Sequence, residues 1–283
     1  MKILSLVSIH NRFSGIHYLI QSLDAQILDS AVFMDLVIVD TSTLAPPSEL
    51  ICDVHARSWI KYIPTTRNLY WSQAMQFGWV NRPNNDYDYV ICLNDDIEVS
   101  PTSLRTFVRD AIKFSHNQKL SCIAASFAND YSSTCLSYGG LNRKSALLPL
   151  HFKQEKGTTN NSIVNVDVVN FNLCIIPFGT AKLLNFFDDR YTHRYSDFDF
   201  CLRCSKIGLK TFVSTTIIGV CPRNACEGTS LEPKLSRLTR LTRRMSSKEH
   251  PIIDRFIFCL SHGGLLWPLY FISPYMNAII FNK

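Results

Sequence analysis

Short apolar runs alternate with helical patterns along the first third of the chain, and this alternation limits the possible folds more than any other feature. Four runs have the length and β-branched content of buried strands: residues 3–9, 35–40, 59–63 and 89–93. Two stretches carry apolar residues at spacings of three and four, as a helix does: residues 16–28 and 70–80. Strands that are apolar on both faces belong to sheets covered by helices on both sides. We therefore predict an α/β fold with a mostly parallel central sheet flanked by helices.

The net charge of the chain is concentrated in one segment. The 283 residues include 29 Lys and Arg against 23 Asp and Glu, which gives a formal charge of +6. Residues 234–248 contain six basic side chains and no acidic one, so the rest of the chain balances at 23 basic and 23 acidic residues. A protein that binds nucleic acid is expected to spread positive charge over a face of its folded body. We therefore expect no nucleic acid partner.

Ten cysteines are present, and their setting favours free thiols. Residues 1–9 are too short for a secretory signal and run directly into polar residues, so we predict a cytoplasmic protein with reduced cysteines. Cys201 and Cys204 have the spacing of a zinc or redox pair. No second pair follows at metal-ligand spacing, and the two cysteines lie in a helical pattern. We therefore favour a structural role for this pair over a metal or redox role.

Polar side chains follow three of the predicted strands. They are His10, Asn11, Arg12, Asp40, Asn94, Asp95 and Asp96. The ligands of a mostly parallel sheet bind beyond the carboxyl ends of its strands. No glycine-rich phosphate loop occurs at these positions, so a bound nucleotide diphosphate would need another means of charge neutralisation. Paired carboxylates can provide it by holding a divalent cation, Mg²⁺ or Mn²⁺, between the protein and the diphosphate.

The segment around the fourth predicted strand carries the most specific pattern. Residues 90–99, Val-Ile-Cys-Leu-Asn-Asp-Asp-Ile-Glu-Val, are followed by Pro101. This segment resembles the family 2 glycosyltransferases of the GT-A fold, in particular bacterial enzymes that add rhamnose or galactose to cell-surface glycans. That family has an apolar strand, an Asn/Asp-x-Asp metal motif and then a Pro that opens a helix. The resemblance therefore implies a GT-A glycosyltransferase.

Three further segments resemble the family in the family's own order. Residues 7–12 are similar to its first strand and base-binding turn, and Asp40 takes the place of its uracil- or thymine-side acid. Residues 68–78 are similar to the segment that lines the nucleotide site, and residues 187–208 are similar to the acceptor side. Together the four matches span about residues 1–220.

The resemblance implies a role for each matching residue. Asp96 would bind the cation, and Asp197 matches the family's catalytic base. The nucleotide sugar would be bound by residues from four segments: His10, Asn11, Arg12, Asp40, Asn68, Trp71, Asn94 and Asp95. The base would take the proton of the acceptor hydroxyl as its oxygen attacks the anomeric carbon opposite the leaving diphosphate, so the configuration inverts. The expected enzyme is an inverting rhamnosyl- or galactosyltransferase that uses a UDP- or dTDP-sugar in surface polysaccharide assembly of the O-antigen or capsule type.

Three positions depart from the family pattern. Ser196 stands where the family usually has a Glu before its base, and Tyr70 replaces a Gly. Cys221 ends an apolar run where the family often has a metal-binding His. A thiol is a soft ligand that suits Mg²⁺ and Mn²⁺ poorly. The resemblance therefore implies either weak cation binding without donor or a cation held by Asp96 and the diphosphate alone.

Other roles for these residues stay open as alternatives. Asp40 and Asp96 could cap the turns or helices that follow them. Asp197 and Asp199 could stabilise the first turn of an exposed helix, and we expect Arg203 to pair with Asp199 at a spacing of four. A nucleotidyltransferase also uses carboxylate-held Mg²⁺ beside a parallel sheet, but its basic, glycine-rich phosphate loop is not found here. A membrane-bound scaffold of the same fold without catalysis is the alternative that is not an enzyme.

The C-terminal part of the chain has the composition of a membrane-associating segment. On a helix over residues 234–248 the leucines and Met245 fall on one face and the arginines on the other. Residues 256–282 have no formal charge and are rich in aromatic side chains. Two glycines and two prolines are expected to break this tail into short pieces.

We therefore expect two parts in the chain. Residues 1–220 would form the catalytic domain, and residues 221–283 would form a helical extension that binds the anionic inner face of the cell membrane. A glycan acceptor built on a polyprenyl diphosphate lies at such a surface. A homodimer formed through the tail, or a helix packed on the catalytic domain, are the alternatives.

Overall fold

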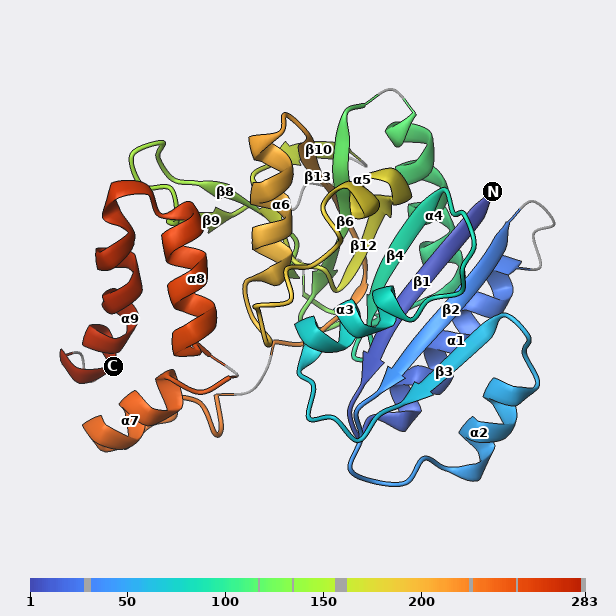
Figure 1. The fold of residues 1–283 in the computed structure, drawn as a ribbon, viewed down its shortest axis with the longest axis horizontal. Coiled ribbons are helices and arrows are strands. Elements are labelled where there is room, and N and C mark those ends of the chain that lie inside the picture. Colours follow the sequence, from blue (N-terminus) through green and yellow to red (C-terminus); the bar gives the residue numbers. More distant parts are fainter. Residues whose placement is uncertain are drawn as a thin grey trace.

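The structure, a computed structural model, describes residues 1–27, 32–116, 118–133, 135–155, 162–223, 226–247 and 249–280. Leu28 and Lys248, which belong to predicted helices, and residues 281 and 282 of the predicted tail lie outside these ranges. The described chain forms an α/β body with its C-terminal helices to one side (Figure 1).

The centre of the body is a sheet in which most strands run in one direction. Among the described residues it has ten strands, and the path β10-β13-β6-β12-β4-β1-β2-β3 contains the longest of them. The bounds along this path are β1 Lys2–Ile9, β2 Phe33–Asp40, β3 Ile60–Pro64, β4 Tyr89–Asn94, β6 Leu120–Ala128, β10 Ile163–Val166, β12 Leu173–Pro177 and β13 Lys210–Val220. Strands β3, β2, β1 and β4 are parallel, β12 is antiparallel to β4 and β6, and β13 is parallel to β6. The predicted fold class is confirmed.

Short strands extend this sheet and form a second one. β5 (Glu98–Val99) pairs with β13, and β7 (Leu136–Tyr138) pairs with β6. β8 (Gly140–Arg143) lies between β9 (Phe152–Gln154) and β11 (Val168–Val169) in a separate antiparallel sheet. β5 lies at the end of β13, beside Gly219 and Val220, whereas β8 packs against Val213 in the first half of β13.

Helices cover both faces of the large sheet because its strands are apolar on both sides. One face is covered by α1 (Phe13–Ile27), α2 (Ser48–His55) and α4 (Pro101–Ser115). The other face is covered by α3 (Trp71–Val80), α5 (Phe178–Leu183) and α6 (Ser196–Lys206). Side chains of β1 alternate between the two cores, with Ile3 and Val7 in the first and Leu4 and Leu6 in the second.

The predicted elements of the first third agree with the structure. The four predicted strands coincide with β1 to β4 within two residues at each end, and α3 begins one residue later than predicted. α1 begins three residues earlier than predicted, at Phe13. α2 was not predicted, because its eight residues bury only Leu50 and Val54 and are too short for a clear helical period.

In the part of the chain that the structure describes, β13 is followed by three α-helices, α7 (Arg237–Arg244), α8 (Ile252–His262) and α9 (Trp267–Ile280), and by a 3-10 turn at Gly264–Leu266 between α8 and α9. The predicted break at the two glycines is confirmed, because α8 ends before Gly263 and Gly264 adopts a positive φ of 56°. The predicted break at Pro274 is wrong, because this proline lies inside α9. Its ring removes the N–H that would bond the carbonyl of Tyr270, and the guanidinium of Arg255 donates to that carbonyl instead. No helix in the described ranges is long and apolar enough to cross a membrane.

α8 is joined to the loop before α6 by a buried acid. Asp254 is fully buried, and its carboxylate accepts hydrogen bonds from the main-chain N–H groups of Thr192 (3.1 Å), His193 (3.1 Å) and Arg194 (3.3 Å). Such a buried carboxylate is stable only because these donors satisfy it. The predicted division of the chain at residue 220 stays a prediction, but α8 is firmly connected to the body.

Candidate active site

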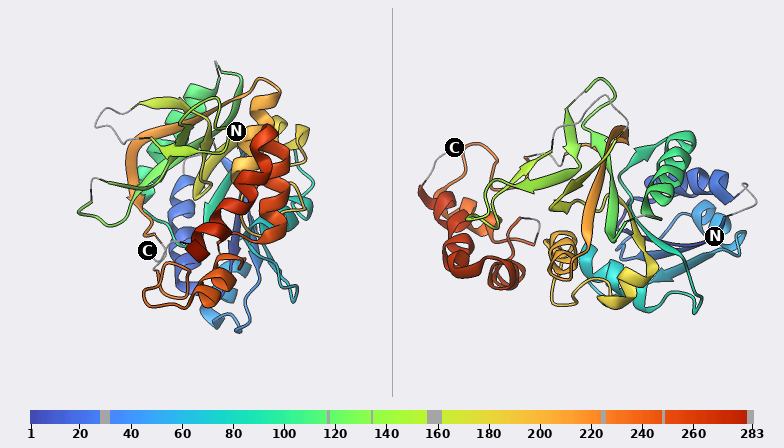
Figure 2. Two further views of the ribbon diagram at one scale, coloured as in Figure 1. Left: turned by 90° about the vertical axis from the view of Figure 1, so that its left-hand side faces the viewer. Right: turned by 90° about the horizontal axis from the view of Figure 1, so that it is seen from above.

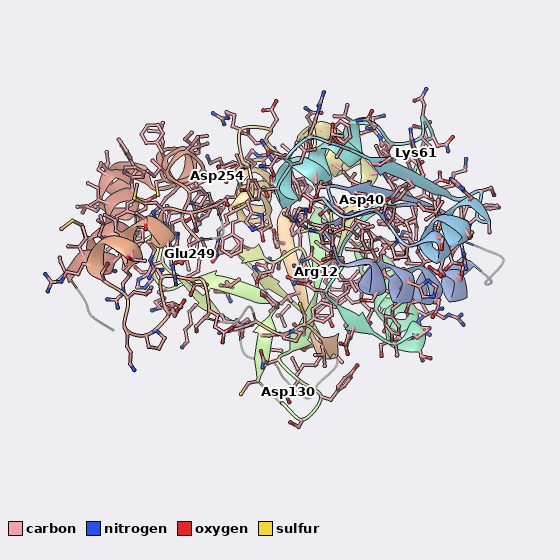
Figure 3. All side chains as sticks on the ribbon, turned by 90° about the horizontal axis from the view of Figure 1, so that it is seen from below. Arg12, Asp40, Lys61, Asp130, Glu249 and Asp254 are labelled. Atoms are coloured by element: carbon pink, nitrogen blue, oxygen red, sulfur yellow. The ribbon has the colours of Figure 1, made fainter. Side chains whose placement is uncertain are left out.

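The carboxyl ends of β1, β2 and β4 meet at one edge of the large sheet. Ser8 is paired with Asn94, and Ile9 is paired with Asp40. The chain passes from β1 to β2 on one side and reaches β4 on the other side only after β3, so the strand order switches between β1 and β4. Ligands of open α/β sheets bind outside the strand ends at such a point. The polar residues after these strands therefore share one face of the molecule, on which Arg12 and Asp40 are labelled in Figure 3.

Arg12 joins the two acids that follow β4. Its Nη1 lies 3.1 Å from Asp95 Oδ1 and 2.9 Å from Asp96 Oδ2. Burial raises the pKa of Asp95 to about 6, although the charge of Arg12 acts in the opposite direction. Burial acts to lower the pKa of Arg12, but the two carboxylates outweigh it and the net pKa is raised. One guanidinium therefore compensates two carboxylates at the place where the resemblance predicts a cation.

Cys221 lies on the other side of Asp96. Its Sγ is 3.8 Å from Asp96 Oδ1 and accepts a hydrogen bond of 3.2 Å from Asn172 Nδ2. Burial and then the charge of Asp96 raise the pKa of the Cys221 thiol to about 12, so the thiol is neutral at pH 7. The close approach depends on Gly219, where a Cβ would lie 2.2 Å from the carbonyl oxygen of Glu98. The end of β13 thus reaches the acid pair, as the resemblance predicts, but it presents a neutral thiol.

Gly15 sets how closely α1 approaches the acid pair. A Cβ at this position would lie 2.1 Å from the main-chain carbonyl oxygen of Asp95. No larger residue fits there unless the first turn of α1 moves away from the end of β4. Gly15 was not predicted as a site residue, because it lies just before the predicted helix at residues 16–28 and only the approach of β4 shows that a larger side chain does not fit.

Asp40 is buried at the end of β2, and both of its carboxylate oxygens already accept hydrogen bonds. Oδ1 accepts a bond of 2.8 Å from the main-chain N–H of Ser42, and Oδ2 accepts a bond from the hydroxyl of Tyr62. Burial, followed by the bond to Asp40, raises the pKa of the Tyr62 hydroxyl. The hydrogen bond from Ser42 caps the turn after β2, which is the alternative role predicted for Asp40. Tyr62 was missed, because the sequence shows it only as part of an apolar strand.

His10 and Asn11 connect the turn after β1 to the loop after β2. Nδ1 of His10 is 2.9 Å from the carbonyl oxygen of Thr41. Oδ1 of Asn11 accepts hydrogen bonds from the main-chain N–H groups of Thr43 (3.1 Å) and Leu44 (3.0 Å). Asn11 has a positive φ of 58°, a conformation that Asn adopts more readily than most residues. These contacts fix the shape of the loop that borders Asp40.

Trp71 and Asn94 contact each other, although they come from different elements. The indole Nε1 of Trp71, the first residue of α3, donates a hydrogen bond of 2.8 Å to Asn94 Oδ1. The Trp71 ring packs on Phe187 with 5.4 Å between ring centroids. Trp71 therefore orients the side chain that precedes the acid pair. Asn68 is exposed on the loop that leads from β3 to α3.

Asp197 comes from a separate element, the first turn of α6. It is partly buried, and its Oδ1 accepts a hydrogen bond of 2.8 Å from the main-chain N–H of Phe198. Burial raises the pKa of Asp197 to about 6, while the Phe198 N–H and the charge of Arg194 act to lower it. A carboxyl with this pKa is mostly ionised at neutral pH and still binds a proton more readily than an ordinary Asp.

The hydroxyl of Tyr138 interacts electrostatically with Asp96 and with Arg194. Burial raises the pKa of its hydroxyl, the charge of Asp96 adds to this effect, and the charge of Arg194 opposes it. Arg194 acts on Asp197 as well. Asp96 and Arg194, which lies three residues before Asp197, therefore both affect the pKa of Tyr138.

Asp199 has a structural role at the base of α6. Its Oδ2 accepts a hydrogen bond of 2.6 Å from Arg203 Nε, and its Oδ1 accepts one of 2.7 Å from His262 Nε2 in α8. Arg203 also donates to the carbonyls of Leu184 and Phe186. The predicted pairing of Asp199 with Arg203 is confirmed. Asp199 is buried and fully engaged, so it holds α6 and α8 together.

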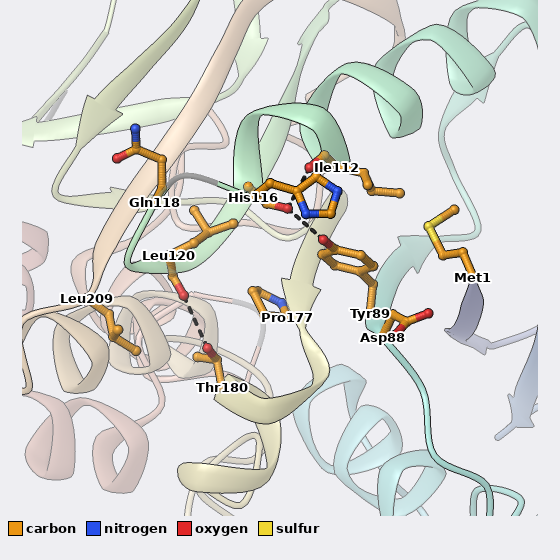
Figure 4. A pocket seen from close by; sticks show the side chains of 11 residues that line it. Met1, Asp88, Tyr89, Ile112, His116, Gln118, Leu120, Pro177, Thr180 and Leu209 are labelled. Atoms are coloured by element: carbon orange, nitrogen blue, oxygen red, sulfur yellow. Dashed lines mark hydrogen bonds between the residues drawn. The ribbon is translucent and has the colours of Figure 1, made fainter.

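A cavity of about 580 Å³ lies at the opposite edge of the sheet (Figure 4). It is lined by residues at the amino-terminal ends of β1, β4 and β6, among them Met1, Tyr89 and Leu120. The acid pair follows the carboxyl end of β4, so this cavity is separate from the candidate active site.

No protein-family model and no curated protein matches the chain. Solved structures do match it. S. aureus TarS 1–349 in complex with UDP-GlcNAc is 12% identical with a TM-score of 0.55, over 99% of this chain and 82% of that chain. The mannosyltransferase PcManGT from Pyrobaculum calidifontis in complex with GDP-Man and Mn²⁺ is 11% identical with a TM-score of 0.54, over 98% of this chain and 71% of that chain. The chain has the fold of these two proteins.

Identities this low carry the fold alone. Both matched structures hold a nucleotide sugar, so the fold is one on which such a donor binds. The activity of this chain depends on its own side chains at the carboxyl edge of the sheet.

Proposed function

We propose that the chain is an inverting glycosyltransferase that transfers a sugar from a UDP- or dTDP-sugar to a glycan acceptor in cell-surface polysaccharide assembly. The observation that carries the proposal is the pair Asp95 and Asp96, compensated by Arg12 at the switch point of the sheet. Asp197, in the first turn of α6, would complete the site. The sequence resemblance favours rhamnose or galactose as the sugar.

The nucleotide part of the donor would lie over the ends of β1 and β2. The turn at His10 and Asn11 and the loop at residues 41–44 are tied together there, and Asp40 lies buried beneath them. A rigid polar loop of this kind can present main-chain groups to a base without a cost of ordering. Asn68 and Trp71, on the side of α3, would border the ribose and the diphosphate.

The side chains at the acid pair suit a hard divalent cation in part. Asp95 and Asp96 offer the carboxylate oxygens that Mg²⁺ and Mn²⁺ prefer, whereas the protonated thiol of Cys221 is a poor ligand. Among the described residues no group of three or more His, Cys, Asp and Glu side chains could hold a metal ion. Asp96, the more exposed of the two acids, would therefore hold the cation, and the donor diphosphate would supply further ligands. A bound cation would stabilise the negative charge of the leaving diphosphate.

Arg12 would change partners when the donor binds. A cation at Asp96 and the guanidinium of Arg12 would compete for the same carboxylate oxygens. Released from the acids, Arg12 can donate to phosphate oxygens, which guanidinium groups bind strongly. We therefore expect the cation and the donor to bind together and each to bind weakly alone.

Asp197 would act as the general base. Its carboxylate would accept the proton of the acceptor hydroxyl, and the freed oxygen would attack the anomeric carbon on the face opposite the diphosphate. Its pKa of about 6 keeps it mostly ionised at pH 7 and makes it a stronger base than an ordinary Asp. The acceptor would approach from the side of α6, and a glycan carried on a polyprenyl diphosphate would bring the protein to the inner face of the cell membrane.

A thermal-shift panel of nucleotide sugars, each with and without Mn²⁺, tests the proposal. A donor present at about 100 times its Kd should stabilise the folded protein by about 2.7 kcal/mol. We expect one UDP- or dTDP-sugar to raise the Tm only together with Mn²⁺. A nucleoside triphosphate that stabilises the protein where no nucleotide sugar does would indicate a nucleotidyltransferase instead.

Variants at two acids separate binding from chemistry. Asp96→Ala should lose the Mn²⁺-dependent shift, whereas Asp197→Asn should keep the shift and lose sugar transfer and donor hydrolysis. Asp86→Asn, at an exposed acid in the turn before β4, is the matched control and should behave as the wild type. Normal turnover by the Asp96 or the Asp197 variant would contradict the assignment of these residues.

A further inference from the structure

The C-terminal helices expose a row of large apolar side chains on the side away from the body. In α8 and α9 these are Ile253, Phe256, Leu260, Leu269, Ile272, Met276, Ile279 and Ile280. Leu265, in the turn between the two helices, is 99% exposed. Figure 2 shows α8 and α9 lying side by side at the end of the molecule, and no other described helix or strand lies on their outer side. Monomeric soluble proteins rarely expose apolar residues in such a group. We call this group the outer face.

The outer face follows from the helical period of α8 and α9. In α8, Asp254, Phe258 and His262 recur at a spacing of four and point toward α6, and the exposed residues lie on the opposite side. In α9, Pro274 and Ala278 are buried against the other helices, and Leu269, Ile272 and Met276 are exposed. Both helices therefore use one side for packing and have a second apolar side that no other described element covers.

The outer face carries no charge. α9 contains no charged residue. α8 contains Asp254 and Arg255, and both point inward: Asp254 accepts from the loop before α6, and Arg255 donates to the carbonyls of Tyr270 and Phe271 and to the hydroxyl of Tyr195. A surface that solvates well would have charged side chains at these positions. The outer face instead has the character of an interfacial membrane helix pair.

α7, which packs against α9, brings positive charge to this end of the molecule, but not in the arrangement that the sequence predicts. Arg240 is buried, Arg243 is paired with Glu232, and Arg244 lies 3.1 Å from Glu249. Lys234 and Arg237 are exposed. The predicted contact through the arginine side of α7 is therefore only partly available, and the larger apolar surface belongs to α8 and α9.

We propose that the outer face binds the surface of an anionic bilayer, with α8 and α9 lying in the headgroup region and Leu265 among the acyl chains. The exposed Lys234 and Arg237 favour an anionic lipid surface, because they attract its headgroups. A second copy of the chain would offer these basic side chains no acidic partner on its own outer face, because that face carries no charge. The proposed membrane binding does not depend on the proposed glycosyltransferase activity. It adds to that proposal, because it would place the candidate active site beside a lipid-linked acceptor.

Flotation with lipid vesicles tests the proposal on the full chain. Vesicles of phosphatidylcholine with about 30% phosphatidylglycerol should carry the protein upward, and neutral vesicles or about 0.5 M NaCl should weaken this binding. Leu269→Asp places a charge in the centre of the outer face and should lower the partition coefficient by about tenfold or more. Leu183→Asp is the matched control, because Leu183 is 69% exposed on α5 and Leu269 is 67% exposed on α9. We expect the control to bind vesicles as the wild type does.

A second variant and a second measurement keep the test decisive. Leu265→Asp, at a fully exposed turn position, should reduce vesicle binding as Leu269→Asp does, and both should retain the Tm of the wild type. Donor hydrolysis in the absence of vesicles should be the same for all variants, so a failure of the proposed activity is seen separately. The proposal is overturned if the wild type does not float, or if the Leu269 and Leu265 variants float as well as the wild type. It is also overturned if light scattering shows a wild-type dimer that these variants dissociate, because a second copy would then cover the outer face.

Discussion

Replacement of Asp197 by Asn should stabilise the folded protein while it removes transfer activity. Burial raises the pKa of Asp197 to about 6 from an ordinary value of 3.8. A group whose pKa is higher in the folded than in the unfolded state binds its proton more tightly when folded, so its ionisation destabilises the fold. This destabilisation is absent below about pH 3, grows between about pH 4 and pH 6, and is complete above about pH 7. Asn carries no charge and therefore avoids this destabilisation. Its amide oxygen can still accept the hydrogen bond from the main-chain N–H of Phe198.

The structure sets the size of the expected effect. A shift from 3.8 to about 6 corresponds to at most about 3 kcal/mol, and the partial exposure of Asp197 reduces the expected value to about 1–3 kcal/mol. The entropy of unfolding of 283 residues is about 0.6 kcal/mol per kelvin at the Tm. The Tm of the Asp197→Asn variant should therefore exceed that of the wild type by about 2–5 °C at pH 8.

Calorimetry at two pH values measures this effect directly. The difference in Tm between variant and wild type should fall to about one third when the pH is lowered from 8 to about 4.5. Asp86→Asn is the control, because that acid is exposed, and its Tm should follow the wild type at both pH values. The same carboxylate should make the transfer rate of the wild type rise through about pH 6 and level off above about pH 7. An equal Tm at pH 8, or a difference that does not depend on pH, would refute the assignment of a buried, ionised Asp197.

Variants at three further positions test the surroundings of the acid pair. Arg12→Ala should weaken donor binding by about tenfold or more at a fixed Mn²⁺ concentration, and Arg12→Lys should restore part of it, as measured by titration calorimetry. Gly15→Ala should lower the free energy of unfolding by about 1–3 kcal/mol, because the new Cβ would lie 2.1 Å from the carbonyl oxygen of Asp95; an unchanged urea midpoint would show that α1 moves freely. Cys221→His should tighten Mn²⁺ binding several-fold and Cys221→Ser should not, because imidazole is a better ligand than either a neutral thiol or a hydroxyl; equal affinities would exclude this position from the cation site.

The order of strands and helices in the first third of the chain, apart from α2, and the edge of the sheet that carries the polar residues were determined by the sequence alone. A run such as residues 89–93 has no polar side chain to expose, so it must be buried on both faces between helices. The acids that follow it must then leave the sheet at the edge where the parallel strands end. Arg12, Asp40 and Asp96 were placed together for this reason, and the structure has them at that edge.

The partners of these residues were decided only by the tertiary structure. Arg12 was predicted as a donor-binding residue, and it bridges two acids 83 and 84 positions further along the chain. Asp199 was expected to pair with Arg203 on its own helix, which is a local contact, but its bond to His262 spans 63 positions. A helical period predicts contacts within one element, where the geometry is the same in every protein. The helical period carries no information on which distant element packs against the helix.

The C-terminal helices show the same limit on a larger scale. The sequence alone determined that α7 is basic and amphipathic and that the tail is apolar and uncharged. It did not determine that Arg240 turns inward, nor that Arg255 donates to the carbonyl that Pro274 leaves without a main-chain donor. The burial of Arg240 and the bond from Arg255 to Tyr270 depend on how α7, α8 and α9 pack together, because both need groups from separate helices to meet, whereas Ser273 donates to the same carbonyl from within α9.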